Sequence, residues 1–466
     1  MLLGFTPLEW VALAGYELLL FAGLFFLIGS MDDIAVDLVW LWLKLTGKAE
    51  METVDRAALR GRPLSGRAAV MIPAWHEAEV IGATVSHALE AWPQDDLRIY
   101  VGCYRNDPAT VSAAIAAAGG NPRVRLVVHG RDGPSSKADC LNRIYAALCE
   151  DERRSGVRAR IVLLHDAEDM VDPAALPLLD RALAQAEFVQ LPVLPQVQPD
   201  SRWIAGHYCD EFAESHGKAM VVREALGAGL PAAGVGCAFS RDALERIALR
   251  AGRPEAPFAG ESLTEDYELG LKIGALGGKS QFLRIRGQDG QLVATRAFFP
   301  GTLNEAVRQK TRWIHGIAFQ GWDRLGWEGS LVERWMRLRD RRGPLAGLVL
   351  ASGYLFFLII TFLWLTSLLG WVDMPKPGAM LQVILLVNVA SFLWRAAWRF
   401  AFTTQEYGVV EGFTAILRIP FANVITIIAG RRALAAYLRS LNGHAPVWDK
   451  TEHRSHPAIL KGAVSR

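Results

Sequence analysis

The stretch Ala159-Arg160-Ile161-Val162-Leu163-Leu164-His165-Asp166-Ala167-Glu168-Asp169 decides the fold. Its first six residues are a short, mainly apolar run rich in branched side chains, which predicts a buried β-strand. An acidic cluster at residues 166–169 follows the strand at once. In α/β proteins, ligands bind beyond the carboxyl ends of the strands, so this junction predicts a functional site as well as a strand.

Similar short strands alternate with helical segments from about residue 64 to residue 327. We expect strands at residues 68–72, 97–103 and 124–128, and helices at residues 79–92, 110–118 and 137–150. Strands and helices in this rhythm form a sheet covered by helices. The expected fold class is therefore an α/β domain with a mixed, mainly parallel sheet. Pro73-Ala74-Trp75-His76-Glu77 and Asp107 also follow strands directly.

Composition separates the two ends of the chain from its middle. The 466 residues are 51% hydrophobic with a mean hydropathy of +0.18, which is too apolar for an ordinary soluble protein of this size. The apolar excess lies at the two ends. The formal net charge is only +2, so charge offers no argument for nucleic-acid binding. The five cysteines are scattered, which favours reduced thiols over a zinc site or a disulfide framework.

Three apolar segments are long enough to cross a membrane, at residues 11–30, 345–370 and 380–399. A cleaved signal peptide is the alternative for the first segment, but no basic stretch precedes it. Five arginines come just before the second segment, at Arg334, Arg337, Arg339, Arg341 and Arg342. Short flanks rich in Lys and Arg stay in the cytoplasm, so we expect the central region and the C-terminus inside and the N-terminus outside.

These segments divide the chain into four parts. Residues 1–48 hold a transmembrane helix and an interfacial helix, residues 64–330 a cytoplasmic domain, residues 344–400 two transmembrane helices, and residues 401–466 an interfacial or re-entrant segment with a cytoplasmic tail. Residues 409–429 are ambiguous because Arg418 and Pro420 lie in their middle. An amphipathic helix in the interface keeps both basic flanks inside, whereas a fourth span does not. We therefore expect three spans.

Asp166 and Glu168 are two positions apart directly after the strand. In an extended backbone alternate side chains point the same way, so both carboxylates would face one divalent cation. Mg2+ and Mn2+ favour one or two carboxylates together with phosphate oxygens. The alternative is a solvated acidic loop or a helix cap, because Asp172-Pro173 follows closely.

Thr264-Glu265-Asp266 opens a helix that we expect at residues 267–276. One interpretation is a capping box, with Ser262 or Thr264 as the cap and acidic residues in the first helical turn. A carboxylate at a rigid helix start is also well placed to act as a general base. The two interpretations are compatible.

Gln309, Arg312 and Trp313 share one helix face through their i, i+3, i+4 spacing. The guanidinium of such a face can pair with a diphosphate, and the amide and indole can contact an acceptor. The alternative is an interfacial helix that anchors in the membrane through Trp and Arg. Lys137, which follows a glycine- and proline-containing loop, is either a phosphate or carboxylate contact or an ordinary surface lysine.

The ordered set of motifs resembles the membrane-embedded branch of the family 2 glycosyltransferases, which have a GT-A fold and include the cellulose and hyaluronan synthases. The likeness is carried by Pro73-Ala74-Trp75-His76-Glu77, Asp107, Lys137-Ala138-Asp139-Cys140-Leu141-Asn142, Asp166-Ala167-Glu168, Thr264-Glu265-Asp266 and Gln309-Lys310-Thr311-Arg312-Trp313. A closer likeness, to bacterial inner-membrane glycosyltransferases of the phage adsorption protein B type, rests on residues 104–110, 165–169 and 447–453. Two positions depart from the family pattern, with Glu168 in place of Asp and His76 in place of Asn.

The resemblance implies a metal-dependent, inverting transfer of sugar from a UDP-sugar donor. Asp266 would act as the catalytic base with Glu265 beside it, and Mg2+ or Mn2+ would be held by Asp166 and Glu168. The remaining implied contacts to the donor are Pro73, Ala74, Glu77, Asp107, Lys137, Asp166 and Arg312. Those to the acceptor and the diphosphate are Gln309, Arg312 and Trp313.

The resemblance also implies a multi-pass protein of the bacterial inner membrane with a cytoplasmic catalytic domain. The acceptor would be a growing exopolysaccharide that the helices pass outward. Three spans are few for a channel, so an export partner or a homo-oligomer remains open. Two alternatives stand beside this hypothesis: transfer of a single sugar to a lipid carrier, and an inactive membrane scaffold or receptor component.

Overall fold

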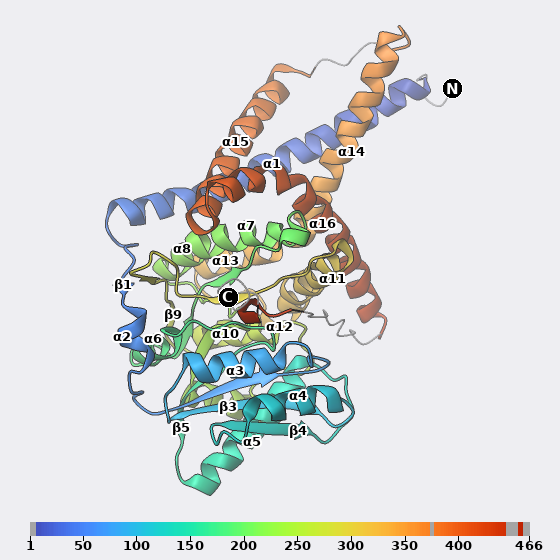
Figure 1. The fold of residues 1–466 in the computed structure, drawn as a ribbon. Coiled ribbons are helices and arrows are strands. Elements are labelled where there is room, and N and C mark those ends of the chain that lie inside the picture. Colours follow the sequence, from blue (N-terminus) through green and yellow to red (C-terminus); the bar gives the residue numbers. More distant parts are fainter. Residues whose placement is uncertain (1–5, 373–376, 444–454, 460–466) are drawn as a thin grey trace.

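The computed structural model describes residues 6–372, 377–443 and 455–459. Its centre is a seven-stranded sheet of order β4-β3-β2-β5-β8-β6-β9 (Figure 1). These strands are β2 (Arg67–Pro73), β3 (Leu97–Tyr104), β4 (Val124–His129), β5 (Ala159–Leu164), β6 (Phe188–Gln190), β8 (Cys237–Ser240) and β9 (Ser280–Phe282). β8 runs antiparallel to β5 and β6, and the other neighbouring pairs of this sheet are parallel. The expected mixed, mainly parallel sheet is confirmed.

The central strand β2 shows why these runs are apolar without alternation. It lies between β3 and β5, with Val70 opposite Ile99 on one side and Leu163 on the other. All three side chains are at most 1% exposed. A parallel strand is covered by helices on both faces, so both sets of its side chains are apolar.

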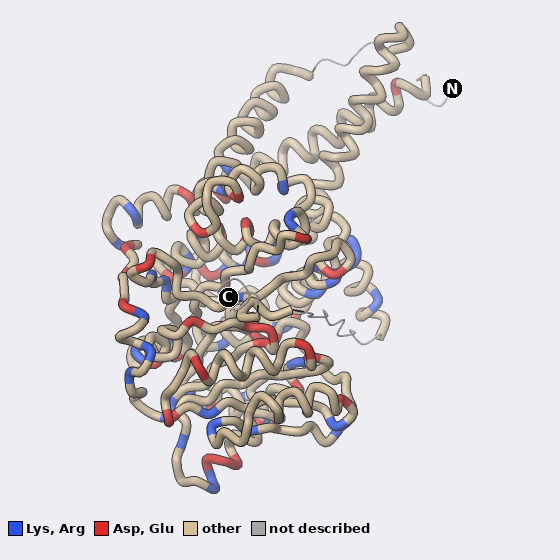
Figure 2. The backbone as a smooth tube through the Cα atoms, in the orientation of Figure 1, with Lys and Arg blue, Asp and Glu red and all other residues tan. Residues whose placement is uncertain are grey.

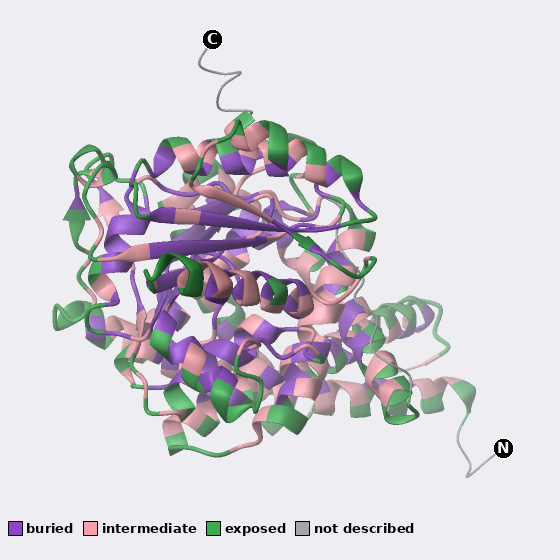
Figure 3. Cartoon of the chain, turned by 90° about the horizontal axis from the view of Figure 1, so that it is seen from below, coloured by how far each residue is buried: buried purple, intermediate pink, exposed green. Residues whose placement is uncertain are grey.

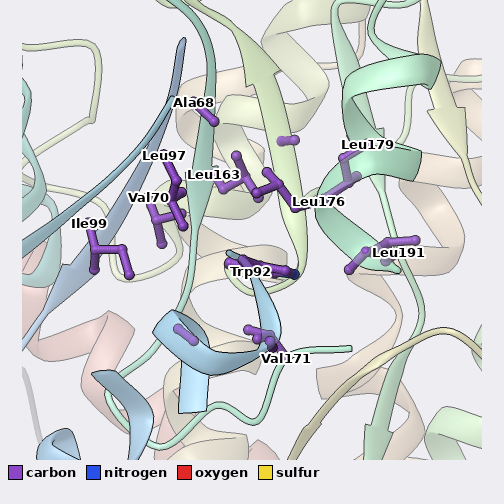
Figure 4. Packing of buried hydrophobic residues seen from close by; sticks show 14 of the residues in the cluster. Ala68, Val70, Trp92, Leu97, Ile99, Leu163, Val171, Leu176, Leu179 and Leu191 are labelled. Carbon is purple, nitrogen blue, oxygen red and sulfur yellow. The ribbon is translucent and has the colours of Figure 1, made fainter. Parts of the chain in front are cut away.

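Helices cover both faces of the sheet and form two separate hydrophobic clusters. One face packs against α3 (Ile81–Ala91), α4 (Pro108–Ala118) and α6 (Ala175–Ala182), and the other against α5 (Lys137–Ser155), α9 (Arg241–Arg250) and α10 (Glu265–Ala275). Figure 3 shows the buried strands between helices whose outer faces are exposed. Figure 4 shows Trp92 within the first cluster, where its indole N–H donates to the carbonyl of Asp172 at 3.0 Å.

Shorter elements connect the sheet to the rest of the chain. Two short parallel pairs lie beside it, β1 (Thr53–Val54) with β10 (Arg286–Gly287) and β7 (Val193–Pro195) with β11 (Thr295–Ala297). The remaining helices are α2 (Arg56–Arg60), η1 (Pro199–Ser201), α7 (Gly206–Glu214), η2 (Ser215–Ala219), α8 (Met220–Ala225), α11 (Leu303–Ile314), η3 (His315–Gln320), α12 (Gly321–Leu325) and α13 (Leu331–Arg341).

Four helices are long and apolar enough to cross a membrane: α1 (Pro7–Leu45), α14 (Gly343–Leu368), α15 (Ala379–Tyr407) and α16 (Val409–Leu441). Three of them, α1, α14 and α15, project together away from the sheet (Figure 1), and their projecting parts carry almost no charged residues (Figure 2). α16 packs against α14 and α15 and also along α11 and α7. Its Arg418 is fully buried and pairs with Asp210 of α7 at 2.7 Å. Three spans and one interfacial helix remain our prediction for the membrane arrangement.

The expected N-terminal transmembrane helix and interfacial helix are one continuous helix, α1, of 39 residues. Asp32 and Asp33 lie within it and pair with Arg342, at 2.7 and 2.8 Å. Arg339 also binds both aspartates. The helix continues past these two acidic residues because arginines that precede α14 neutralise them.

Candidate active site

Asp169 shapes the loop that follows β5. Its Oδ2 accepts the backbone N–H of Asp166 at 3.0 Å and lies 2.9 Å from Nδ1 of His165. Ala167 and Glu168 form a turn, in which the N–H of Asp169 donates to the carbonyl of Asp166 at 3.3 Å. The expectation of an extended backbone from Asp166 to Glu168 is therefore wrong, because the buried Asp169 carboxylate folds the loop back.

Lys137 and Asp166 form an ion pair at this loop, with 2.5 Å between Nζ and Oδ1. Lys137 is the first residue of α5, which Ser136 caps by accepting the N–H of Asp139. Burial alone would lower the pKa of the lysine, but three nearby carboxylates raise it above its ordinary value: Asp166, Glu265 and Asp266. Lys137 is thus the cation of an acidic site and not an ordinary surface lysine.

Glu265 and Asp266 open α10 in different environments. Glu265 is only 5% exposed, and its Oε1 has no hydrogen-bond partner among the described residues. Burial, followed by the charge of Asp266, raises the pKa of Glu265 to about 7. Burial also raises the pKa of Asp266, whereas the nearby Lys137 lowers it. Asp266 is the more exposed of the two residues.

Thr264 connects the start of α10 to η3, the π-helical segment after α11. Its side chain makes no capping hydrogen bond, so Thr264 is not the cap of a capping box, although the first turn of α10 is acidic as expected. The hydroxyl of Ser262 accepts the N–H of Thr264 at 3.3 Å. The side chain of Thr264 packs instead against Gly316, where a Cβ would lie 2.5 Å from Oγ1 of Thr264. In the same segment Gln320 Oε1 accepts the N–H of Leu263 at 2.9 Å. The turn that carries Asp266 is therefore docked on the continuation of α11, and π-helical turns often occur at functional sites.

α11 presents Gln309, Arg312 and Trp313. The charge of Arg312 partly offsets the rise in the pKa of both Glu265 and Asp266, so the guanidinium lies within electrostatic range of the acidic pair. Trp313 packs edge-on against Tyr208 of α7, with 6.0 Å between ring centroids. Gln309 Oε1 is buried without a hydrogen-bond partner in the described part of the chain. The packing of Trp313 on α7 does not support the membrane-anchor alternative.

Gly234 is a residue of the site that sequence reasoning missed. Its φ is +77°, and a Cβ there would collide with Oδ2 of Asp266. Gln190 holds the surrounding loop, because its buried amide accepts the N–H of Ala233 at 2.8 Å and donates to the carbonyl of Val235 at 2.9 Å. The available sequence signal was the pair of glycines in Gly234-Val235-Gly236, which does not reveal the distant carboxylate.

Asp107 shapes the loop after β2. Its Oδ2 accepts the N–H of His76 at 2.7 Å and its Oδ1 accepts the N–H of Thr110 at 3.3 Å, at the start of α4. The hydroxyl of Thr110 accepts the N–H of Glu77 at 2.9 Å. His76 has a φ of +52°, a conformation that non-glycine residues rarely adopt and that often marks functional sites. Both oxygens of Asp107 bind backbone here, and its assignment to the donor stays a prediction.

The neighbouring aromatic side chains form a wall beside this loop. The ring of Trp75 stacks on that of His76 with 4.1 Å between centroids and packs edge-on against Tyr104 at 5.0 Å. A Cβ at Gly133 would lie 2.5 Å from the Trp75 indole. Pro73 ends β2, and Ala74 follows it with its N–H donating to the carbonyl of Gly102 at 2.8 Å.

The sequence between residues 66 and 316 matches the family model described as glycosyltransferase like family 2. That range contains every motif of the site described above. The chain belongs to the family 2 glycosyltransferases. Its mixed, mainly parallel sheet is the GT-A-like α/β domain expected from the motifs, and the long apolar helices are additions to it.

Two curated relatives of this glycosyltransferase cover most of its length. Bacteriophage adsorption protein B of Escherichia coli strain K12 is 33% identical over 451 residues, which cover 91% of this chain and 60% of the relative. Bacteriophage N4 adsorption protein B of Escherichia coli O157:H7 matches with the same identity and coverage. The chain spans about 60% of the length of these relatives.

Solved glycosyltransferase structures are similar at lower identity. The mannosyltransferase PcManGT from Pyrobaculum calidifontis, in complex with GDP-Man and Mn2+, is 18% identical with a TM-score of 0.49, covering 88% of this chain and 99% of that chain. Glucosyl-3-phosphoglycerate synthase from Mycobacterium tuberculosis, in complex with Mn2+, UDP and phosphoglyceric acid, is 20% identical with a TM-score of 0.34, covering 57% of this chain and 81% of that chain.

The glycosyltransferase brings its charged motif residues to one site from separate elements. Asp166 comes from the loop after β5, and the others come from the first turns of α5 and α10 and from α11: Lys137, Glu265, Asp266 and Arg312. Within the described residues no group of three or more His, Cys, Asp or Glu side chains is placed to hold a metal ion. The tail motif at residues 447–453 lies outside the described residues.

Proposed function

We propose that this glycosyltransferase transfers a sugar, with inversion, from a UDP-sugar to a glycan acceptor at the cytoplasmic face of a bacterial inner membrane. The observation that carries the proposal is the convergence of two cations and two carboxylates on one site: Lys137, Arg312, Asp166 and Asp266. Fixed cations suit a diphosphate group, because they stabilise the charge that develops as it leaves.

Asp266 is the proposed general base. Its carboxylate takes the proton from an acceptor hydroxyl as that oxygen bonds to the anomeric carbon, and the bond from this carbon to the diphosphate oxygen breaks. Lys137 and Arg312 then stabilise the extra negative charge on the departing diphosphate. Glu265 is less suited to this step because it is buried, so an acceptor hydroxyl cannot reach its carboxylate as readily.

Asp166 and Glu168 are the proposed ligands of a hard divalent cation, carried on a turn and not on the extended backbone first expected. Two carboxylates with the remaining coordination left to phosphate oxygens is an arrangement that Mg2+ favours. The side chain of Asp166 is 32% exposed, so a bound diphosphate could share a cation with it. When bound, Mg2+ or Mn2+ would supply Lewis-acid neutralisation of the leaving diphosphate. Glu168 is one methylene longer than the Asp of related motifs, so it is the ligand to test first.

The membrane part of the proposal rests on α1, α14 and α15. Their projecting halves are apolar (Figure 2), and charged residues gather where they meet the catalytic domain. We propose that this bundle crosses the membrane and lies beside the path of a growing exopolysaccharide, with an export partner or a second copy completing that path. The curated relatives are named for bacteriophage adsorption, so a receptor role without turnover is the alternative from another class.

The direct test is UDP release by the purified full chain across a panel of UDP-sugars with Mn2+ or Mg2+. Asp266→Asn should lower release by about 10^2- to 10^4-fold, the usual contribution of a general base. Asp242→Asn, a matched change of a carboxylate that is 71% exposed, should leave it unchanged. Near-normal release by Asp266→Asn would refute the base assignment.

Two further readouts separate the alternatives. The length of a product made with labelled donor distinguishes a polymer from a single sugar on a lipid carrier. Absence of UDP release with every donor and either cation would favour an inactive scaffold or receptor component.

A further inference from the structure

The C-terminal residues 455–459 lie against the acidic loop after β5. His456 is fully buried, and its Nε2 is 3.1 Å from the backbone carbonyl oxygen of Asp169, a residue 287 positions earlier in the chain. The short segment is visible near the label C in Figure 1. Residues from the far end of the chain therefore contact the loop that carries the two candidate metal ligands.

The hydrogen bonds of His456 define which nitrogen carries the proton. Its Nδ1 accepts the backbone N–H of Ala458 at 3.1 Å. The proton of the neutral ring is therefore on Nε2, which donates to the carbonyl of Asp169. Burial lowers the pKa of His456, which agrees with a neutral ring in this geometry. The imidazole acts here as a single, directed donor to the loop backbone.

Three side chains hold alternate carbonyls of this loop. The hydroxyl of Thr84 donates to the carbonyl of Ala167, and Nε2 of His87 is 2.9 Å from the carbonyl of Val171. Both of these residues belong to α3. His456 holds the middle carbonyl, that of Asp169, from a different part of the chain. The backbone of the loop is thus held by hydrogen bonds from α3 and from the C-terminal segment at residues 455–459.

Asp169 connects these backbone hydrogen bonds to the candidate metal ligands. Its carboxylate accepts the N–H of Asp166 at 3.0 Å, and its own N–H donates to the Asp166 carbonyl and closes the turn at Glu168. A shift of the Asp169 backbone would therefore change the direction of both carboxylates. Residues that orient metal ligands commonly change metal affinity by about 10- to 100-fold when they are mutated.

We propose that His456 is a positioning residue for the acidic loop, and that the C-terminal segment thereby sets the affinity of Asp166 and Glu168 for a divalent cation. This inference rests on the proposed metal-dependent function. Because the bond is to a backbone carbonyl, any side chain that places an N–H at the position of Nε2 should replace histidine.

The test measures Mn2+ binding by the purified full chain with UDP present, from the free Mn2+ signal in electron paramagnetic resonance, with a sample of UDP and Mn2+ without protein as the blank and without turnover. His456→Ala should weaken binding about tenfold. His456→Gln, whose amide N–H reaches the position of Nε2, should bind within a few-fold of the wild type. His456→Asn is too short and should behave like the alanine variant. Ser455→Ala, an exposed neighbour, is the matched control and should bind normally.

A kinetic readout separates positioning from loss of folding. At saturating Mn2+ the turnover of His456→Ala should recover most of the wild-type value, because only the cation affinity has changed. Wild-type Mn2+ affinity in both His456→Ala and His456→Asn would overturn the inference while leaving the proposed function intact. Equal loss in His456→Gln and His456→Asn would also overturn it. Failure of the wild type to bind Mn2+ would overturn the inference together with the cofactor assignment.

Discussion

Replacement of Gly234 by alanine should disable the proposed base without unfolding the protein. Gly234 lies in the loop before β8 with a φ of +77°, and an added Cβ would collide with Oδ2 of Asp266. The loop cannot easily move away, because the buried Gln190 binds the backbone on both sides of Gly234. We therefore expect the carboxylate of Asp266, and not the loop, to shift.

The size of the effect follows from two separate costs. The left-handed backbone of an alanine costs roughly 1–2 kcal/mol in stability. A displacement of about 1 Å at a catalytic group can lower the rate about 10^2-fold, which corresponds to roughly 2.7 kcal/mol at the transition state. The first cost appears in thermal unfolding and the second in the turnover number.

Gly227 offers a control with the same backbone conformation. Its φ is +70°, and a Cβ there would meet nothing within 4 Å. Gly227→Ala should therefore lose about as much stability as Gly234→Ala and keep its turnover. The assay is UDP release at saturating donor and cation, combined with thermal unfolding of both variants. Similar turnover in the two variants would refute the reasoning, because the contact with Asp266 would then have no effect on catalysis.

Three further predictions concern other parts of the site and its support. Gly316→Ala should lower turnover about tenfold or more, because its Cβ would lie 2.5 Å from Thr264 Oγ1. Gly321→Ala is the control, because its Cβ would lie 3.4 Å from the nearest heavy atom. It should be close to wild type in the same UDP-release assay. Arg418→Met should destabilise the protein by about 3–5 kcal/mol in thermal unfolding, because it leaves the buried carboxylate of Asp210 without its partner. Unchanged unfolding would contradict this. Lys137→Met should move the acidic limb of the pH–rate profile to higher pH. The lysine lowers the pKa of the Asp266 carboxyl, and a protonated base cannot accept a proton. An acidic limb that stays in place or moves to lower pH would contradict this.

The α/β domain could be predicted from local sequence because its signals are local. Strands such as β2 and β5 are buried on both faces, so each must be a short apolar run. α5 and α10 begin where polar and acidic residues follow a loop, and the structure places their starts at Lys137 and Glu265. Parallel strands carry their ends to one edge, which is why motifs far apart in sequence were expected at one site.

The long helices were predictable in composition but not in arrangement. Apolar length alone marks α1, α14, α15 and α16 as candidates to cross a membrane. Whether Asp32 and Asp33 interrupt the first helix depends on arginines about 300 positions away, which pair with them. Arg418 in α16 is likewise stabilised by Asp210, a contact that only the folded chain supplies.

The sequence alone determined the fold class, the family motifs and the residue types of the site, because apolar periodicity and motif spacing act over a few neighbouring residues. Tertiary structure decided how the motifs are held. It turned the acidic loop at Asp169 and placed Gly234 against the carboxylate of Asp266. It also brought His456 within hydrogen-bond distance of the carbonyl of Asp169, 287 positions away. Each of these arrangements is a contact between distant segments, and no local pattern specifies which distant residue will fill a given space or satisfy a given carbonyl.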